Sequence, residues 1–212
     1  MSESSKPLSG NVLSGFIVLE GIDGAGTSTQ LNRISEQMRL KGYSLFSTYE
    51  PSDGPVGGLL RNILCGEINA KSKTIALLFA ADRNEHLLNP RNGIITNLEK
   101  HDFVISDRYL FSSLAYQSID CGFDYVEMLN AAYPLPEFLI YIDVPIKESQ
   151  SRISKRTIRD IYDGLSFQEK VILGYEKAFD QYKDRGMNFL RVDGSSSVGE
   201  ISKEIMDFIL SH

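Results

Sequence analysis

The chain has 212 residues, of which 42% are hydrophobic and 24% are charged, and its formal net charge is −6. This length fits one domain with a substantial core, and the composition is that of a soluble globular protein. The negative net charge argues against general nucleic-acid binding, which needs a basic surface, whereas a pocket for one nucleotide needs only a few local cations.

The ends and the cysteines of the chain predict an ordinary intracellular protein. No apolar run approaches the ~18 residues that a membrane span requires, and the polar N-terminus lacks the apolar stretch of a signal peptide. We therefore expect a flexible tail at residues 1–15 and a cytoplasmic location without membrane contact. Cys65 and Cys121 match no metal-ligand spacing, so we interpret them as small buried thiols in a reducing compartment.

Short apolar runs alternate along the chain with longer stretches of helical period, which predicts an α/β fold. The first strand, FIVLE at residues 16–20, is apolar almost throughout, as expected for a strand that is buried on both faces. We expect one domain, residues 16–212, in which a doubly wound, five-stranded parallel sheet carries helices on both faces. The other predicted strands are residues 44–49, 103–106, 138–144 and 189–192, and predicted helices end near Gly42, before Gly66, at Leu88, near Asp184 and near Ile209.

A glycine-rich loop, GIDGAGTSTQ, follows the first strand and opens onto a helix. In the pattern G-x-x-x-x-G-K-[ST], glycines let the backbone amides point at phosphate oxygens, and the helix N-terminus favours the anion. The hydroxyl position, which would coordinate magnesium, is Ser28. The sequence thus predicts a P-loop that binds ATP through Gly21, Asp23, Gly24, Ala25, Gly26, Thr27, Ser28 and Thr29.

The lysine of this pattern is missing, because its position is occupied by Thr27. A lysine there would place a positive charge on the β- and γ-phosphates, whereas threonine offers a neutral hydroxyl. The ordinary alternative is a glycine-rich turn without a ligand, but the strand–loop–helix context favours nucleotide binding.

Further motifs narrow the interpretation. EPSDGP (50–55), LLFAADR (77–83), SDRYLFSSLAYQ (106–117) and PEFLIYIDV (136–144) follow the loop in the order typical of thymidylate kinases, and a basic segment precedes a long helix. From residue 16 onward the chain resembles this family of P-loop nucleoside-monophosphate kinases. The resemblance implies phosphoryl transfer from ATP to dTMP with magnesium, giving ADP and dTDP, and a homodimer.

Spacing and resemblance together predict an acceptor site. Phe79 and Arg83 are four residues apart and so share one helix face; in the family the matching residues stack on thymine and donate to its carbonyl edge. The ordinary alternative is a core phenylalanine beside a surface arginine. The resemblance places Tyr116 against the 2′ face of the sugar. The dTMP-binding residues it implies are Asp23, Pro51, Phe79, Arg83, Arg108, Ser113, Tyr116 and Gln117.

Asp107 and Arg108 come at the end of the third predicted strand, where open α/β sheets bind ligands. The resemblance makes Arg108 the clamp on the monophosphate and makes Asp107, with Ser28, the organiser of magnesium. The ordinary alternative is a helix-capping aspartate beside a surface salt bridge. Tyr49 stands where many bacterial relatives have arginine, so a second cation near the phosphates is also missing.

A basic stretch, RISKRTIR, follows the fourth predicted strand. Such a run is usually a solvated face. In thymidylate kinases without an arginine in the P-loop, where this chain has Ala25, a mobile lid supplies the catalytic cations. We therefore expect a lid at about residues 152–163 that carries Arg152, Lys155, Arg156 and Arg159.

Two other functions stay open at this point. One is a kinase for another nucleotide, such as dUMP, or for a deoxynucleoside. The other is a catalytically silent nucleotide-binding module, which the neutral Thr27 and Tyr49 motivate.

Overall fold

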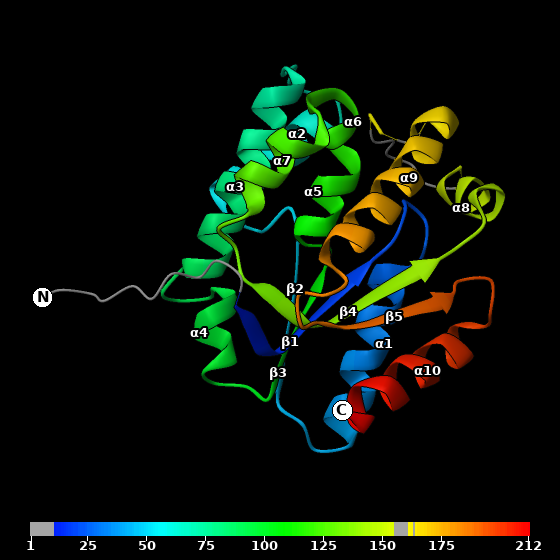
Figure 1. Cartoon of the computed structure of the whole chain (residues 1–212). Helices are drawn as coiled ribbons and strands as arrows, with labels where there is room; N and C mark the ends of the chain where they lie inside the picture. The colour runs from blue at the N-terminus through cyan, green and yellow to red at the C-terminus, as the bar shows by residue number, and fades with distance from the viewer. Residues whose placement is uncertain (1–10, 155–160, 163) are drawn as a thin grey trace, which may run out of the picture.

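The computed structural model describes residues 11–154, 161–162 and 164–212 and arranges them around one sheet (Figure 1). The sheet has five strands in the order β2-β3-β1-β4-β5, and every neighbouring pair is parallel, as predicted. The strands are β1 Val12–Glu20, β2 Leu45–Tyr49, β3 Phe103–Asp107, β4 Leu135–Asp143 and β5 Asn188–Asp193.

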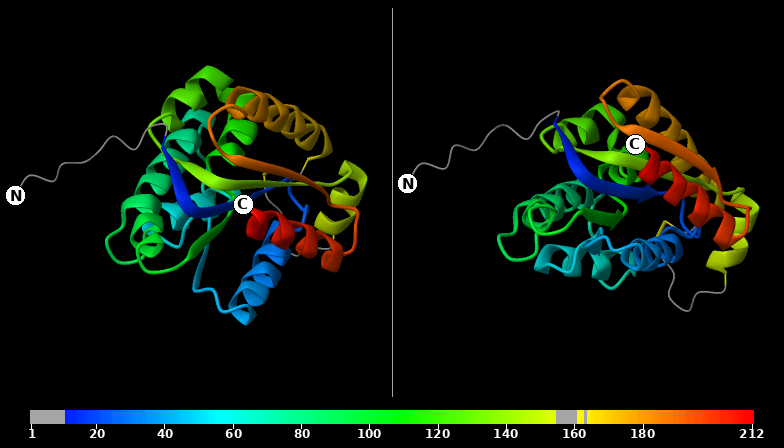
Figure 2. Two further views of the ribbon diagram at one scale, coloured as in Figure 1. Left: turned by 60° about the horizontal axis from the view of Figure 1, so that its bottom comes forward. Right: turned by 90° about the horizontal axis from the view of Figure 1, so that it is seen from below.

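Helices cover both faces of this sheet. Helices α1 and α10 lie on one face, and α5 and α9 lie on the other, which is the doubly wound arrangement (Figure 2). None of the helices in the described ranges has the length and apolar character needed to cross a membrane. The helices are α1 Thr27–Leu40, α2 Pro55–Leu64, α3 Ser72–Leu88, α4 Ile94–Leu98, α5 Leu110–Tyr116, α6 Ser118–Cys121, α7 Phe123–Asn130, α8 Ile146–Ile153, α9 Leu165–Tyr182 and α10 Val198–Ser211.

Strand β1 lies at the centre of the sheet, and its last five residues, 16–20, are fully buried. Its neighbours are β3 on one side and β4 on the other, with Leu19 paired to Asp107 and to Ile140. Because parallel strands end at one edge of the sheet, this register sets the loop after β1 beside the chain that leaves β3. The two segments that the sequence marked for phosphate binding are therefore neighbours in space.

Strand β1 begins earlier than predicted, which corrects the expected tail at residues 1–15. Val12 and Leu13 pair with Leu135 and Pro136 of β4, which itself begins three residues before the predicted start. Gly15, at φ 75°, interrupts the regular pairing, and the ladder resumes at Ile17. The apolar pattern missed this extension because it depends on a partner strand more than a hundred residues away. Residues 1–10 lie outside the described part of the chain.

The cysteines also differ from expectation. Cys65 is exposed at the end of α2, and Cys121 is half-buried at the end of α6, so the prediction of two buried thiols is wrong. Both lie at helix ends, which a hydrophobic pattern does not locate to within a residue or two.

Candidate active site

The glycine-rich loop connects the buried end of β1 to α1. Gly24 and Gly26 have φ angles of 79° and 98°, which side chains other than glycine rarely adopt. At Gly24 an added Cβ would also lie 2.9 Å from the carbonyl oxygen of Ser149. The loop then turns directly into α1 at Thr27, whose side chain is buried. A glycine-rich loop that leads into a helix N-terminus of this kind can bind an anion without the lysine.

Ser28 and Asp107 are brought together at the mouth of this loop. The Ser28 hydroxyl donates a hydrogen bond to Asp107 Oδ2. Asp107 Oδ1 is buried and has no hydrogen-bond partner among the described residues. A buried carboxylate oxygen of this kind needs a partner, and a cation would supply it.

This pair fits the predicted magnesium. The ion is held in kinases by one or two protein oxygens together with substrate phosphates and water. In the described ranges there is no cluster of three or more histidine, cysteine, aspartate or glutamate side chains that could hold a metal without a nucleotide. The donor set of one hydroxyl and one carboxylate thus suits a magnesium ion that arrives with ATP.

Arg108 stands at the start of the chain that leaves β3, with an unusual φ of 73°. Its Nη2 donates to Asp23 Oδ1 at 2.7 Å, and its Nη1 donates to the Gly21 carbonyl and to Ser112 Oγ at 3.0 Å each. Burial acts to lower the pKa of Arg108, but Tyr116 and Asp23 outweigh it and raise that pKa well above its ordinary value. Arg108 is therefore always positively charged, and its hydrogen bonds to the loop hold its orientation. It is not a surface residue.

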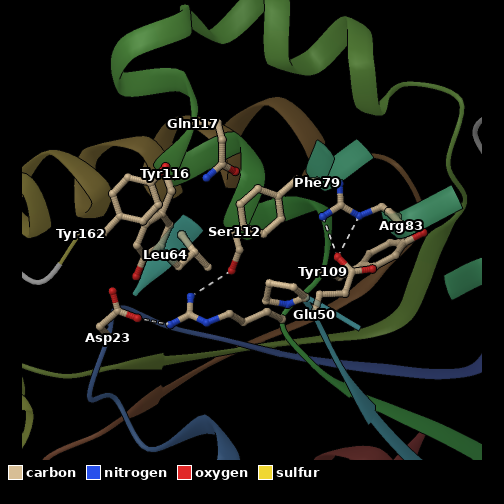
Figure 3. A pocket seen from close by; sticks show the side chains of 12 residues that line it. Asp23, Glu50, Leu64, Phe79, Arg83, Tyr109, Ser112, Tyr116, Gln117 and Tyr162 are labelled. Carbon is tan, nitrogen blue, oxygen red and sulfur yellow. Dashed lines mark hydrogen bonds and ion pairs between the residues drawn. The ribbon is translucent and has the colours of Figure 1, made fainter. Parts of the chain in front are cut away.

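A cavity of about 520 Å³, which includes space open to solvent, lies above Arg108 between the helical layer and the end of the sheet. Figure 3 shows the rings of Phe79, Tyr116 and Tyr162 and the Gln117 amide around it. Seven of the eight residues predicted to bind dTMP therefore line one space, and Ser113 is the exception. The lining is Asp23, Glu50, Pro51, Leu64, Phe79, Arg83, Arg108, Tyr109, Ser112, Tyr116, Gln117 and Tyr162.

Arg83 lies at the wall of this cavity and is only 1% exposed, so the alternative of a surface arginine is wrong. Its Nε and Nη2 donate to Glu50 Oε2 at 3.0 and 2.7 Å, its Nη2 also donates to Ser113 Oγ at 3.0 Å, and its Nη1 donates to Asn130. These bonds use four of the five guanidinium N–H groups. The second N–H at Nη1 donates to no partner among the described residues.

Ser112, for which no role was predicted, lines the cavity in place of the predicted Ser113. Ser113 was predicted to bind dTMP, but it is not among the residues that line the cavity, and its hydroxyl accepts a hydrogen bond from Arg83. Ser112 lines the cavity instead and bonds to Arg108. Residues one apart on a helix face different directions, so the choice between them depends on how α5 is rotated.

A second cavity lies over the glycine-rich loop and shares Asp23 and Arg108 with the first. Arg152, from α8, reaches it and donates to the carbonyls of Gly24 and Ala25 at 3.2 Å each. Lys155, Arg156 and Arg159 lie outside the described residues. The lining is Asp23, Gly24, Gly26, Thr27, Ser28, Thr29, Asp107, Arg108 and Arg152.

Two adjoining cavities, one over a phosphate loop and one lined by aromatic rings, are what a kinase with two nucleotide substrates needs. Comparison with known proteins decides the family. A model of the family described as thymidylate kinase matches residues 19–205. The chain belongs to the thymidylate kinase family. Members are ATP-dependent nucleoside-monophosphate kinases, and this assignment favours an enzyme over the silent module.

Individual relatives agree with the thymidylate kinase assignment. A Treponema pallidum protein, named provisionally as a thymidylate kinase, is 38% identical over 199 residues, which cover 92% of this chain and 95% of the relative. The probable thymidylate kinase of Methanocaldococcus jannaschii is 37% identical over 197 residues, with the same shares of each chain covered. The solved thymidylate kinase of Candida albicans has the same fold, with a TM-score of 0.76 at 22% identity over 93% of this chain and 92% of that one.

Several residues of this thymidylate kinase site escaped the motif analysis. Glu20 and Tyr175 bond to each other beneath Arg108, and Gln168 bonds to both the backbone amide and the carboxylate of Asp23. Only Glu20 carried a signal in the sequence, since a charged residue closes an otherwise apolar strand. The two residues of α9 could not be recognised, because nothing in that helix's own pattern says which side chains face the loop.

Proposed function

We propose that the protein transfers the γ-phosphate of ATP to dTMP in the presence of magnesium, giving ADP and dTDP. The observation that carries this proposal is the pair of cavities that meet at Asp23 and Arg108. A donor nucleotide in one and an acceptor in the other would present their phosphates to each other, which supplies most of the catalysis in phosphoryl transfer.

The donor side is the glycine-rich loop. Its amides and the N-terminus of α1 would bind the ATP phosphates, and Arg152 braces the loop through two of its carbonyls. Ser28 and Asp107 would hold magnesium, whose charge offsets that of the phosphate oxygens during transfer. Asp23 faces the acceptor side and would approach the phosphate and the sugar hydroxyl of dTMP.

The acceptor side is the aromatic cavity. Phe79 and Arg83 line this cavity; Phe79 would stack on the thymine ring, and Arg83 would donate to a carbonyl of the base. Tyr116 would close the space at the 2′ position against a ribose hydroxyl, while Pro51 and Gln117 complete the walls. Arg108 would clamp the monophosphate with its forked donors.

The chemistry needs no covalent intermediate. An oxygen of the dTMP phosphate attacks the γ-phosphorus in line, the bond to the β-phosphate oxygen breaks, and ADP leaves. The protein contributes orientation and positive charge, and Arg108 provides the fixed cation between the two phosphates. A lid at about residues 152–163, carrying Lys155, Arg156 and Arg159, would add charge to the transferring group and exclude water.

Thr27 is compatible with this reaction if other cations replace the missing lysine. Thr27 is one of the residues around the donor cavity, and the guanidinium of Arg152 lies against the same loop. The loop geometry that binds phosphate depends on its glycines and not on the lysine. We therefore infer that the lid cations carry the charge that lysine carries in other P-loop kinases.

An ADP-release assay across dTMP, dUMP, UMP, CMP, GMP and AMP tests the proposal. We expect the highest kcat/KM with dTMP, because Phe79 would stack on the base, Arg83 would donate to its carbonyl and Tyr116 would exclude a 2′-hydroxyl. Equal or better turnover of UMP or AMP would remove the dTMP assignment. Absence of any acceptor-dependent ADP release, with ATP still bound, would restore the silent-module alternative.

We also propose a homodimer that works in the cytoplasm, where ATP and dTMP are available. Leu59 of α2 and Leu77 of α3 are 38% and 50% exposed on neighbouring helices, which supports a covered apolar face there. Light scattering should give about twice the chain mass of 23.7 kDa. Leu77→Glu should lower that mass, whereas Leu173→Glu, on the exposed face of α9, should not; an unchanged mass for both variants, or a monomeric wild type, argues against this surface.

A further inference from the structure

Beneath Arg108 lies a carboxylate with no assigned role. Glu20, the last residue of β1, is fully buried. Its Oε1 accepts from the backbone amides of Tyr109 and Ser112 at 2.9 and 3.1 Å. Its Oε2 accepts from the hydroxyls of Ser112 and Tyr175 at 2.6 and 2.8 Å. All four donors of this cluster converge on one charge at the base of the acceptor cavity.

The same two hydroxyls are bonded to Arg108. Arg108 Nη1 donates to Ser112 Oγ at 3.0 Å and to Tyr175 Oη at 3.3 Å. An ionised carboxylate only accepts hydrogen bonds, and its contacts with Ser112 and Tyr175 are shorter than the 3.1 Å from Tyr175 Oη to the Gly21 carbonyl or the 3.0 Å between the two hydroxyls. The hydroxyl protons of Ser112 and Tyr175 therefore point at Glu20. Their lone pairs are then left facing Arg108. The order of donation runs from the guanidinium to the hydroxyls and from the hydroxyls to the carboxylate.

We propose that Glu20 is a positioning residue for the acceptor phosphate, because through Ser112 and Tyr175 it holds the Arg108 guanidinium in the orientation that binds the monophosphate. This inference rests on the proposed function, in which Arg108 clamps dTMP. Glu20 does not touch substrate in this arrangement. Its charge acts on Arg108 through the two hydroxyl groups, which bond to Nη1. Arg108 Nη2 remains directed at Asp23 and the cavity.

Burying a charge costs free energy, so a carboxylate is an unfavourable choice if its only role is to hold a helix in place. This cost argues for a role of Glu20 beyond packing. Burial raises the pKa of Glu20 to about 7, although the attraction of Arg108 and the hydrogen bonds of Ser112 and Tyr175 oppose that rise. A carboxylic acid or amide in its place would keep most of the hydrogen bonds without the penalty of a buried charge. What only the charge supplies is the acceptor at Oε2 for both hydroxyls.

The groups around Glu20 do not titrate near neutral pH themselves. Arg108 comes from the chain after β3, Tyr109 precedes α5, Tyr175 comes from α9, and Tyr141 lies beside it on β4. The pKa of Arg108 is raised well above its ordinary value, and burial raises the pKa of each of the three tyrosines. Glu20 is thus the member of this cluster whose charge changes around pH 7.

Glu20→Gln tests the proposal, because glutamine keeps the shape and the acceptor at one oxygen but turns the other position into a donor. We expect kcat/KM for dTMP to fall by about tenfold or more, carried mainly by KM for dTMP, while KM for ATP changes little. The thermal midpoint at pH 8 should equal or exceed that of the wild type, since a buried charge has been removed. Tyr175→Phe, which deletes one of the two hydroxyls, should give a smaller change in the same direction.

The pH profile separates positioning from packing. In the wild type, kcat/KM for dTMP should rise through about pH 7 as Glu20 ionises. The substrate phosphate also titrates near pH 6 and contributes to both proteins. In Glu20→Gln, only the pH dependence of kcat/KM that comes from the substrate phosphate should remain. The matched control is Glu137→Gln on β4, whose carboxylate bonds to Ser14 and Gly15 far from the cavity, and it should keep the wild-type profile.

A measurement without catalysis keeps this inference distinct from the proposed function. The ¹H–¹⁵N side-chain resonances of Arg108, assigned with Arg108→Lys, should shift with a midpoint near pH 7 in the wild type and stay constant in Glu20→Gln. Unchanged Arg108 resonances across this range in the wild type, or a Glu20→Gln enzyme with the KM and pH profile of the wild type, would overturn the positioning role. A wild type that shifts at Arg108 but does not turn over dTMP would instead contradict the proposed function.

Discussion

Arg108 and Asp23 form an ion pair, with 2.7 Å between Nη2 and Oδ1, at the junction of the two cavities. Asp23 belongs to the loop after β1, and Arg108 belongs to the chain after β3, so the parallel register of those strands brings the pair together. Both side chains are partly exposed, at 20% for Arg108 and 17% for Asp23. The pair can therefore open toward a phosphate that enters from either side.

Replacing Arg108 tests the clamp. Arg108→Ala removes a forked cation from a desolvated site, and such losses cost about 2–5 kcal/mol. We expect kcat/KM for dTMP to fall by about 30-fold or more. Arg108→Lys should recover little, since an ammonium cannot bond to Asp23 and a phosphate in the same plane. Steady-state kinetics with dTMP varied measures both; wild-type values in either variant would return Arg108 to a structural role.

Tyr116 tests the sugar preference. Its ring is buried beside Arg108, with 5.2 Å from the ring centroid to Cζ. Tyr116→Ala should raise kcat/KM for UMP relative to dTMP because the ring no longer fills the 2′ side. Tyr116→Phe keeps the ring and is the control, with selectivity expected to stay as in the wild type. An unchanged UMP-to-dTMP ratio in Tyr116→Ala would exclude steric selection by this ring.

The Arg83–Glu50 pair tests how the base-reading arginine is held. Burial acts to raise the pKa of Glu50, but Arg83 and His86 together outweigh it and the pKa is lowered, so Glu50 is ionised in the folded protein. Arg83→Met leaves that carboxylate buried with His86, at 3.2 Å, as its remaining partner, which should lower the free energy of unfolding by about 3–5 kcal/mol. Urea unfolding at pH 7 measures the loss.

The double variant Arg83→Met with Glu50→Gln is the matched control for this prediction. It removes the unpaired charge and should recover part of the stability. The pKa of Glu50 is lower in the folded protein than in the unfolded chain, so its ionised form stabilises the folded protein at pH values above the unfolded pKa. This stabilisation is lost as the pH falls through the folded pKa. A double variant no more stable than Arg83→Met would contradict this account.

Substitutions in the basic segment test the proposed lid. Arg156→Ala and Arg159→Ala should lower kcat more than they weaken ATP binding, if these cations act on the transferring phosphate. Arg152→Ala should differ, because Arg152 braces the loop carbonyls of Gly24 and Ala25, and we expect a higher KM for ATP. Single-turnover kinetics with ATP titrations separates the two effects. An unaltered kcat in the double variant of Arg156 and Arg159 would make the segment a solvated charge run.

Replacing Thr27 with lysine tests whether other cations have taken over the role of the missing lysine. If the lid cations have taken over its role, the wild type turns over dTMP and Thr27→Lys changes kcat by less than about tenfold. The new ammonium would then add to charge that is already present. A wild type that binds ATP without turning it over, and that Thr27→Lys activates, would identify a silent relative. Both proteins belong in one assay at saturating ATP, dTMP and magnesium.

The sequence by itself was enough for the local parts of this protein. The run of buried residues in β1, the glycine spacing of the loop and the helical period after it predict a phosphate loop, because backbone conformation there depends on neighbouring residues. The alternation of strands and helices was likewise enough to predict the parallel sheet, since consecutive parallel strands need a crossover connection, usually a helix, between them. Motif order then pointed to the family.

Only the tertiary structure decided which side chains meet. Arg83 looked like a surface residue in its own helix, yet Glu50, Ser113 and Asn130 converge on it from three other segments. Glu20 and Tyr175 are 155 residues apart and share a hydrogen bond. The physical reason is that burial and partner choice depend on how helices rotate and pack against the sheet, and periodicity reports only which face of each element is apolar.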